Sequence, residues 1–446
     1  MIKKLISMAF LIFGFVVSAQ IPISNSSVAQ NDFPEERVQL SINSNLLLAG
    51  ELLQYKAFSL TSEKKPSMLS KMLYVSLRNE NDSIVFSNKH RVENGTVNGD
   101  FFIPASLKTG IYRLVGYTNF SRNNAIQPYA VQYIYVVNSF LKSPKLAEKS
   151  TDTTNVFIKF ENIAASNFSS KSGFFLIKTD KSTYGLREKV NLKIEKIDKN
   201  ISGNFVLSVR KIKPLKISEF SPDSRNIQPS ETFYLPEIRG EIISGTVLSD
   251  GNKPVANKEV SLTIPGKDYV FKLAKTNKAG RFFFSVAEGY DAETSIFQVN
   301  QLSENIENFK IVLDDKAFKI GESNLPNIKL DPFLKDWLEN RSIQMQIENA
   351  YYEIKKDSIF REASNAAFFD NLGTVFLLDD YTRFPTVRET FVEVVTLAAI
   401  RGTGNNARFI VNNEYDPKGI AKFNDLDPLV LLDGMQILNN ADLINY

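Results

Sequence analysis

Apolar and polar residues alternate with a period of two along much of the chain before residue 316. Between Leu73 and Arg78, for example, leucine and valine alternate with tyrosine, serine and arginine, which is the pattern of a strand with one buried and one exposed face. The same pattern predicts these strands: Arg37–Ile42, Leu52–Leu60, Met72–Arg78, Ser83–Ser87, Thr96–Ile103, Ile111–Tyr117 and Ala130–Val137. Seven short strands in about a hundred residues are typical of an immunoglobulin-like β-sandwich.

One polar turn that leads into an alternating strand occurs twice, 137 residues apart. The first copy runs from Asn43 to Glu51, and the second from Asp180 to Glu188, so that the two turns and the two acids correspond. A repeat of this length indicates successive domains of one type rather than a solenoid. A strand is also expected at Val156–Phe160, ahead of the second copy.

The pattern changes after Asp315. Residues 331–352 carry a broad apolar face with a helical period, and Thr386 with Glu389 forms a capping box that predicts a helix reaching about Ile400. Asp433-Gly434 follows an apolar strand as a turn signal. This last part is expected to be α+β.

Residues 1–19 have the pattern of a secretory signal. Lys3 and Lys4 precede the apolar run Leu5–Val17, and Val17-Ser18-Ala19 supplies small residues for cleavage. The run is shorter than the ~20 residues that span a bilayer, so we expect export rather than anchoring.

Composition limits the chemistry that the chain can perform. The absence of cysteine excludes disulfides, thiolate nucleophiles and thiolate metal sites. The single histidine, His90, is interpreted as a surface or loop residue because catalytic and zinc histidines need partners that the sequence lacks. Paired acids such as Glu35/Glu36 are interpreted as solvated. We therefore expect no enzyme and no catalytic, cofactor-binding or metal residues, and the even mixture of 53 basic and 50 acidic residues predicts no nucleic-acid partner.

The first two modules resemble macroglobulin-type sandwiches. In the first, the motifs are Gly50-Glu51, Gly99-Asp100-Phe101 and Gly110-Ile111-Tyr112-Arg113-Leu114. The second has the motif Asp180-Lys181-Ser182-Thr183-Tyr184, where the first departs from it with Asn43-Ser44-Asn45-Leu46-Leu47.

The later modules resemble two other families. Gly245-Thr246-Val247 and Gly280-Arg281-Phe282 are similar to a carboxypeptidase regulatory-like domain. The stretch from Asp427 to Gly434, together with Arg383-Phe384-Pro385, is similar to the plug domain of TonB-dependent outer-membrane receptors.

The expected fold class is mostly β, with tandem immunoglobulin-like or macroglobulin-type β-sandwiches followed by a small α+β plug-like domain. The expected parts are a signal peptide (1–19), a flexible leader (20–34), a macroglobulin-type β-sandwich (35–138), a linker or long loop (139–173), a second macroglobulin-like β-sandwich (174–240), a carboxypeptidase regulatory-like β-sandwich (241–316), a helical connector (317–374) and the plug-like domain (375–446).

These resemblances imply an exported protein of the periplasm or outer membrane of a Gram-negative-type envelope. A receptor of the TonB-dependent class needs a closed barrel after its plug. The sequence ends at Tyr446, twelve residues after Gly434. We therefore expect either that these residues begin a longer protein or that the plug-like unit works without its own barrel.

The expected function is a non-enzymatic, outer-membrane-associated scaffold or binding subunit of a receptor or translocation complex. One alternative is the N-terminal portion of a TonB-dependent receptor-like transporter, and a second is a surface carbohydrate-binding protein. The expected partners are outer-membrane β-barrels or other envelope proteins, with membrane association indirect or through a barrel that these residues do not encode. The candidate partner-docking residues are Arg383, Phe384, Asp427, Asp433 and Gly434.

Overall fold

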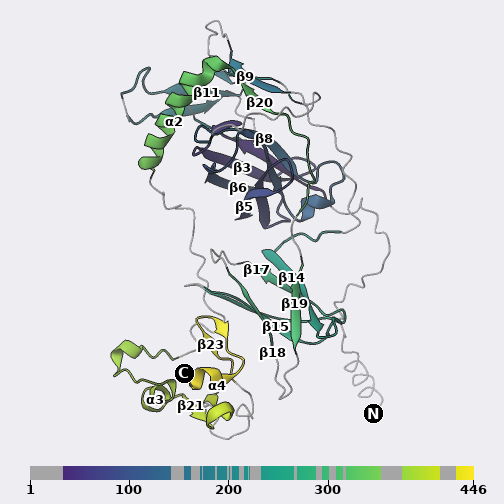
Figure 1. Ribbon diagram of the computed structural model, residues 1–446, viewed down its shortest axis with the longest axis vertical. Helices are drawn as coiled ribbons and strands as arrows, with labels where there is room; N and C mark the ends of the chain where they lie inside the picture. The colour runs from purple at the N-terminus through teal and green to yellow at the C-terminus, as the bar shows by residue number, and fades with distance from the viewer. Residues whose placement is uncertain are drawn as a thin grey trace, which may run out of the picture. The chain divides into compact units, whose positions relative to one another are not determined.

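The computed structural model describes residues 34–141, 155–161, 171–172, 174–185, 188–197, 200, 203–209, 215–218, 220, 233–265, 269–287, 294–300, 308–314, 318–352, 374–411 and 428–445. The predicted signal peptide and the candidate Asp427 lie outside these ranges. From Glu36 to Tyr446 the chain forms one unit, and Figure 1 labels many of its elements. None of the helices in the described ranges is long and apolar enough to cross a membrane.

The first sandwich has two sheets, with strand orders β1-β3-β6 and β2-β8-β7-β4-β5. Its strands are Glu36–Ile42 (β1), Leu46–Leu48 (β2), Leu52–Thr61 (β3), Met72–Arg78 (β4), Ile84–Arg91 (β5), Thr96–Phe102 (β6), Gly110–Tyr117 (β7) and Ala130–Val137 (β8), with a 3₁₀ turn at Phe120–Asn123 (η2). All seven predicted strands are present, and β2 is an additional strand that pairs in parallel with β8. One strand was placed too early: β5 extends to Arg91, so that His90 belongs to a strand rather than to a loop.

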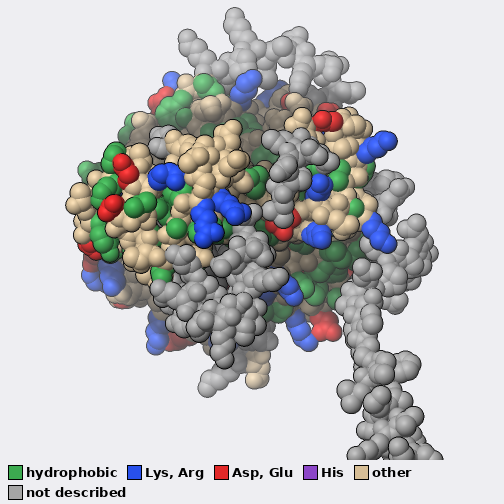
Figure 2. Space-filling model, turned by 90° about the horizontal axis from the view of Figure 1, so that it is seen from below, with side chains coloured by type: hydrophobic (Ala, Val, Ile, Leu, Met, Phe, Trp, Pro, Cys, Tyr) green, Lys and Arg blue, Asp and Glu red, His purple; other side chains and the backbone are tan. Residues whose placement is uncertain are grey.

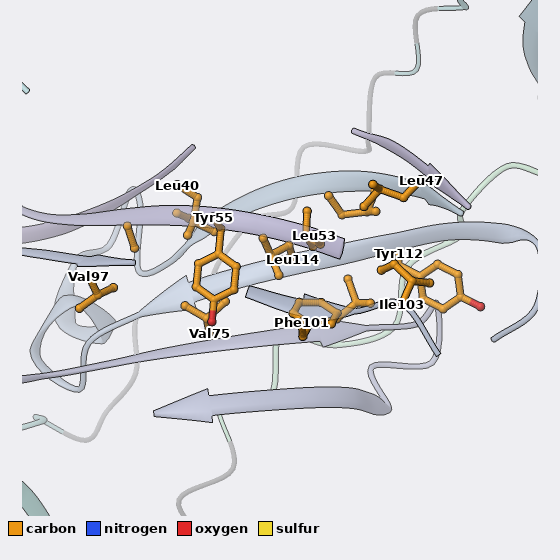
Figure 3. Packing of buried hydrophobic residues seen from close by; sticks show 14 of the residues in the cluster. Leu40, Leu47, Leu53, Tyr55, Val75, Val97, Phe101, Ile103, Tyr112 and Leu114 are labelled. Carbon is orange, nitrogen blue, oxygen red and sulfur yellow. The ribbon is translucent and has the colours of Figure 1, made fainter. Parts of the chain in front are cut away.

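The core of this sandwich lies between the two sheets. Leu53 and Tyr55 of β3 lie in one buried cluster with Val75 of β4 and Leu114 of β7 (Figure 3). The alternation in β3 and β4 therefore has its predicted physical cause, because every second side chain points into this cluster.

The outer face of the five-stranded sheet is also covered. Every residue of β7 except its first is buried. Val115 and Tyr117 of β7 pack against Ile320 and Phe318, which lie in the stretch that precedes the strand Ile328–Leu330 (β20). A strand covered on both faces becomes apolar on both, which explains why β7 does not alternate cleanly.

The second region consists of two three-stranded sheets, with orders β10-β11-β12 and β13-β9-β20. The strands are Val156–Phe160 (β9), Lys171–Ser172 (β10), Phe175–Thr179 (β11), Leu192–Lys196 (β12), Leu215–Ile217 (β13) and Ile328–Leu330 (β20). β9 coincides with the strand predicted there. β20 pairs in parallel with β9, so the chain comes back to this region after it has built the third sandwich.

The third sandwich has strand orders β17-β14-β19 and β16-β15-β18. Its strands are Glu241–Ser249 (β14), Glu259–Ile264 (β15), Val270–Lys275 (β16), Arg281–Val286 (β17), Ile296–Asn300 (β18) and Phe309–Leu313 (β19). Phe282 and Phe284 of β17 and Leu262 of β15 fill its core. The protein is therefore mostly β and built of tandem β-sandwich domains, as the sequence predicted.

A shared core joins the first sandwich to the sheet around β9. Leu48, Ile111 and Val137 of the sandwich lie in one buried cluster with Ile158 of β9 and Leu334. Leu334 ends the 3₁₀ turn Pro332–Leu334 (η3), which leads directly into helix α2, Lys335–Ala350. The first sandwich and the sheet around β9 are therefore not independent domains, because neither buries this cluster without the other.

The C-terminal part is α+β. Its elements are Leu378–Asp380 (η4), Val387–Glu393 (α3), Ala398–Arg401 (β21), Gly404–Asn406 (η5), Arg408–Val411 (β22), Leu431–Leu432 (β23), Met435–Gln436 (β24) and Asn440–Ile444 (α4). Thr386 caps α3 as predicted, accepting a hydrogen bond from the Glu389 backbone N–H at 3.1 Å. The helix ends at Glu393 instead of Ile400 because the β-branched run that follows disfavours helix, and residues 398–401 form a strand.

Candidate interaction site

The two repeated turns, which begin at Asn43 and Asp180 and are here called the first and second lead-in turns, share one backbone and one side-chain hydrogen bond. The Asn43 N–H donates to the Gln54 carbonyl at 3.0 Å, and the Gln54 N–H donates to the Asn43 Oδ1 at 3.1 Å. In the second copy, the Asp180 N–H donates to the Asn191 carbonyl and the Asn191 N–H donates to the Asp180 Oδ1, both at 3.1 Å. The two turns therefore share these two hydrogen bonds, and each partner lies 137 residues from its counterpart.

The two repeated acids also play the same structural role. Glu51 accepts a hydrogen bond from the Leu48 N–H at 2.8 Å, and Glu188 accepts one from the Gly185 N–H at 2.7 Å. In both copies the carboxylate holds the turn three residues before it, which aims the chain into the next strand.

The cation beside each acid comes from a different place. Glu188 is paired with Lys181 from its own turn, and this contact lowers the pKa of the Glu188 carboxyl. Ser44 stands at the position that corresponds to Lys181, so the first turn has no lysine. Glu51 is paired instead with Arg341 of α2, whose Nε and Nη2 lie 2.6 and 2.7 Å from its two oxygens. A helix 290 residues away thus supplies the charge that the first turn lacks.

Helix α2 covers the rest of this turn. Gly50 has a φ of 91°, which favours glycine, and a Cβ atom there would lie 2.8 Å from the Met345 sulfur, so a larger residue would require the Met345 side chain to shift. Arg341 also donates to the Leu46 carbonyl at 3.1 Å, and the Ser139 and Ser342 hydroxyls share a hydrogen bond at 3.0 Å. The first lead-in turn is therefore a helix-docking surface that α2 occupies.

A second polar junction links the first and third sandwiches through two buried acids. The Tyr74 hydroxyl donates to Glu237 at 2.9 Å, and the Ile242 N–H donates to the same carboxylate at 2.9 Å. Lys89 of the edge strand β5 pairs with Glu241 at 2.8 Å. Burial, followed by the nearby Glu237 charge, raises the pKa of Tyr74, so that its hydroxyl remains a donor.

Glu36 corrects the interpretation of the first acid pair as solvated. The side chain is 1% exposed and accepts hydrogen bonds from the hydroxyls of Ser67, Ser70 and Thr118. Buried carboxylates are tolerated only when hydrogen-bonded in this way. Its role is to tie the start of β1 to the neighbouring loops.

His90 is not a surface or loop residue. It is half-buried in β5, and its Nε2 lies 2.6 Å from the hydroxyl of Tyr55, which belongs to β3 of the other sheet. Burial lowers the pKa of His90 and raises the pKa of Tyr55 to about 12. Both groups therefore stay neutral near pH 7, and their hydrogen bond links the two sheets of the first sandwich.

Two of the candidate docking residues lie close together ahead of α3. Arg383 is exposed and forms an ion pair with Asp379, while Phe384 is half-buried. On the face of the molecule shown in Figure 2, basic, acidic and apolar side chains are interspersed rather than gathered in one patch.

The Asp433-Gly434 turn lies against the third sandwich. The Thr263 hydroxyl of β15 donates to the Gly434 carbonyl at 3.1 Å. Gly434 has a φ of 83° and is buried, and a Cβ atom there would lie 2.3 Å from the ring of Tyr269. Asp433 is exposed beside it. Gly434 packs against the third sandwich, whereas the Asp433 side chain remains accessible at the surface.

Within the described ranges, no three carboxylates or histidines are grouped so that they could hold a metal ion. What the arrangement offers chemically is exposed turns, ion pairs and strand edges. Sequence reasoning missed the Arg341–Glu51 pair, although the missing lysine at Ser44 was a visible signal for it.

No protein-family model matches the chain, and no curated protein matches it. Among solved structures, the CARDB domain of a Pyrococcus furiosus protein is 14% identical with a TM-score of 0.18, covering 24% of this chain and 90% of that one. The adhesin InvE of Yersinia pseudotuberculosis is 11% identical with a TM-score of 0.17, covering 62% of this chain and 58% of that one. A β-glucosidase from Listeria innocua is 14% identical with a TM-score of 0.17, covering 23% of this chain and 16% of that one. All three TM-scores are low, so the fold assignment rests on the strand pairing and burial described above.

Proposed function

We propose that this protein is a non-enzymatic, exported scaffold that works at the outer membrane as a binding subunit of a receptor or translocation complex. The observation that carries the proposal is the shared core between the first sandwich and the sheet around β9, which α2 closes. A string of modules fixed in this way presents its exposed edges and turns at constant spacing, which suits a scaffold that must engage more than one surface.

The buried ionisable groups support a structural role for the chain. Glu36 accepts hydrogen bonds from three hydroxyl groups and one backbone N–H, His90 is bonded to Tyr55, and Glu237 accepts a hydrogen bond from Tyr74. Each of these groups stabilises a junction of the fold.

The location and the partner class rest on the sequence. The pattern of residues 1–19 supports export, and the resemblances to envelope families support an outer-membrane setting. The exposed Arg383 and Asp433 are the groups that we expect to contact an outer-membrane β-barrel or another envelope protein.

The test is an affinity pull-down of the native, tagged protein from mildly solubilised envelopes, followed by mass spectrometry. We expect a mature N-terminus after Ala19 and outer-membrane barrel proteins recovered in a fixed ratio. Arg383→Ala and Asp433→Ala should lower that ratio, whereas Lys335→Ala, at a side chain that is 77% exposed on α2, should not. Recovery of a freely soluble chain without any partner would refute the proposal.

The same experiment distinguishes the proposed scaffold from the alternative, a TonB-dependent receptor-like transporter. The resemblance of the Asp433-Gly434 turn to a receptor plug favours that alternative. Peptides from beyond Tyr446 together with no stoichiometric partner would support it over the accessory subunit.

A further inference from the structure

Strand β12 lies at the edge of the sheet β10-β11-β12, and within the described ranges no strand pairs with its other side. Leu192 and Ile194 are 40% and 46% exposed, and Val190 just before the strand is 46% exposed. Exposed apolar side chains on an open edge are a ready template for another strand. Edge strand β5 of the first sandwich differs, because Lys89 and Arg91 on that strand contact the third sandwich through Glu241 and Ala287.

The ladder fixes which backbone groups face outward. The Asp180 N–H donates to the Asn191 carbonyl at 3.1 Å, and the Ile197 N–H donates to the Phe174 carbonyl at 3.0 Å. Odd-numbered residues of this strand therefore bond to β11, and the alternation of an antiparallel pair turns the even-numbered ones away from it. The N–H and C=O groups of Leu192 and Ile194 point to the open side.

The charges beside this edge are unbalanced. Lys178 of β11 lies directly opposite Lys193 of β12, and Glu195 serves both, at 3.7 and 2.8 Å. Two ammonium groups thus share one carboxylate. The stretch 171–197 as a whole carries seven basic and three acidic residues. An incoming acidic residue opposite Lys193 would restore the balance, because opposite charges on facing positions stabilise a strand pair.

We propose that the open edge of β12 binds an extended segment of a partner protein in which an acidic residue stands between two apolar ones. The inference rests on the binding role proposed above and names the site and the chemistry of the partner. The apolar residues would flank Leu192 and Ile194, and the acid would face Lys193. The backbone groups of the partner would continue the ladder, in the manner of β-strand addition. A second copy of this chain fits less well, since it would bring a second basic surplus to the same edge.

The test measures binding of a short synthetic peptide of alternating valine and glutamate to the full chain by fluorescence anisotropy. Ile194→Pro removes an outward N–H while leaving the bonds to β11 in place, a substitution that edge strands tolerate. We expect at least a tenfold loss of affinity for Ile194→Pro and for Lys193→Glu. Lys216→Glu on β13 is the matched control, with the same change of charge at an exposed site elsewhere in the second region, and should stay within twofold. A peptide with lysine in place of glutamate should prefer the Lys193→Glu chain.

Three outcomes overturn the inference. They are no peptide binding, binding that Ile194→Pro leaves unchanged, or a wild-type dimer in sedimentation analysis that Ile194→Pro dissolves, which would make a second copy the occupant. The pull-down separates this inference from the proposed function. If the Ile194→Pro chain still recovers envelope partners, the proposed function stands but the β12 edge is not the binding site. If the wild-type chain binds the peptide but recovers no envelope partner, the β12 site stands and the proposed function is refuted.

Discussion

Replacing Arg341 with alanine tests whether α2 is held by the charge that the first lead-in turn lacks. The substitution removes both hydrogen bonds to Glu51 and the one to the Leu46 carbonyl. It also removes the guanidinium that lies 5.1 Å from the ring of Trp337. Glu51 keeps its bond to the Leu48 N–H but loses its cation.

The size of the effect follows from the burial of the pair. Removing one partner of a fully buried ion pair costs about 3–5 kcal/mol, whereas an exposed pair contributes about 0.2–1 kcal/mol. The side chains of Arg341 and Glu51 are 25% and 15% exposed, which places this pair between the two limits. We expect the free energy for detaching α2 to fall by about 2 kcal/mol, which corresponds to about 30-fold faster amide exchange in the helix.

The assay is native-state hydrogen exchange, because a chain of several modules does not unfold in one step and local opening is the quantity of interest. Glu339→Ala is the control, since the Lys335–Glu339 pair on the same helix is 77% and 62% exposed at 3.9 Å. That variant should change exchange little. If Arg341→Ala leaves the exchange of α2 as it was, the ion pair does not hold the helix and the reasoning fails.

Adding Ser44→Lys to the Arg341→Ala chain separates the turn from the helix. Lys181 serves Glu188 from the equivalent position. Ser44 is 8% exposed and its hydroxyl donates to the Leu46 carbonyl at 2.7 Å, so we expect a lysine there to reach Glu51 only when α2 is loosened. We expect the Leu48 amide, which stays bonded to Glu51, to exchange more slowly than in Arg341→Ala alone, while α2 remains loosened. If exchange slows in the Leu48 amide and in α2 together, the added charge stabilises the protein as a whole and not the turn in particular.

Three further predictions concern the first sandwich and the C-terminal turn. Because the pKa of His90 is lowered in the folded protein, the unfolded chain takes up a proton first as the pH falls. The stability of the first sandwich should therefore decrease below about pH 6.5. The urea midpoints at pH 7.5 and 5.5 should differ less in His90→Gln than in the wild-type chain. Gly99→Ala would place a Cβ atom 2.4 Å from a tyrosine ring and should destabilise the sandwich by about 1–3 kcal/mol, whereas Gly110→Ala, with its nearest neighbour at 3.8 Å, should be close to neutral in the same urea titration. Gly434→Ala combines a φ of 83° with a contact at 2.3 Å and should release the turn from the third sandwich, seen as faster limited proteolysis there; an unchanged digestion rate would contradict that contact.

Much of the fold could be predicted from local pattern. The alternation located the strands of the first sandwich because in β1, β3 and β4 every second side chain faces the buried cluster between the sheets, although β7 is buried on both faces. The capping box located the start of α3, but its end was missed because the apolar residues after Glu393 fit a strand as well as a helix. Composition-based reasoning misplaced Glu36 and His90, since nothing in their immediate neighbours shows that Thr118 and Tyr55 reach them from distant parts of the chain.

The candidate site could be predicted only in part. Arg383 and Asp433 are exposed where the sequence placed them, but the packing of Gly434 on the third sandwich depends on residues about 170 positions away. The same holds for β20, which joins β9 across the whole third sandwich. Contacts of this range leave no periodic signal in the sequence, because each partner satisfies its own local pattern.

The departure of the first turn from the repeat did carry information about what covers it. Leu46 and Leu47 replace Thr183 and Tyr184 of the second copy, where the tyrosine hydroxyl donates to Asp180 at 2.5 Å and helps lower the pKa of that carboxyl to about 2. A turn that exchanges such a polar group for two leucines must bury them, and both are: Leu47 inside the first sandwich, and Leu46 in the core shared with β9. The loss of the lysine and the gain of the leucines are therefore one change, from a turn that is complete by itself to a turn that needs α2.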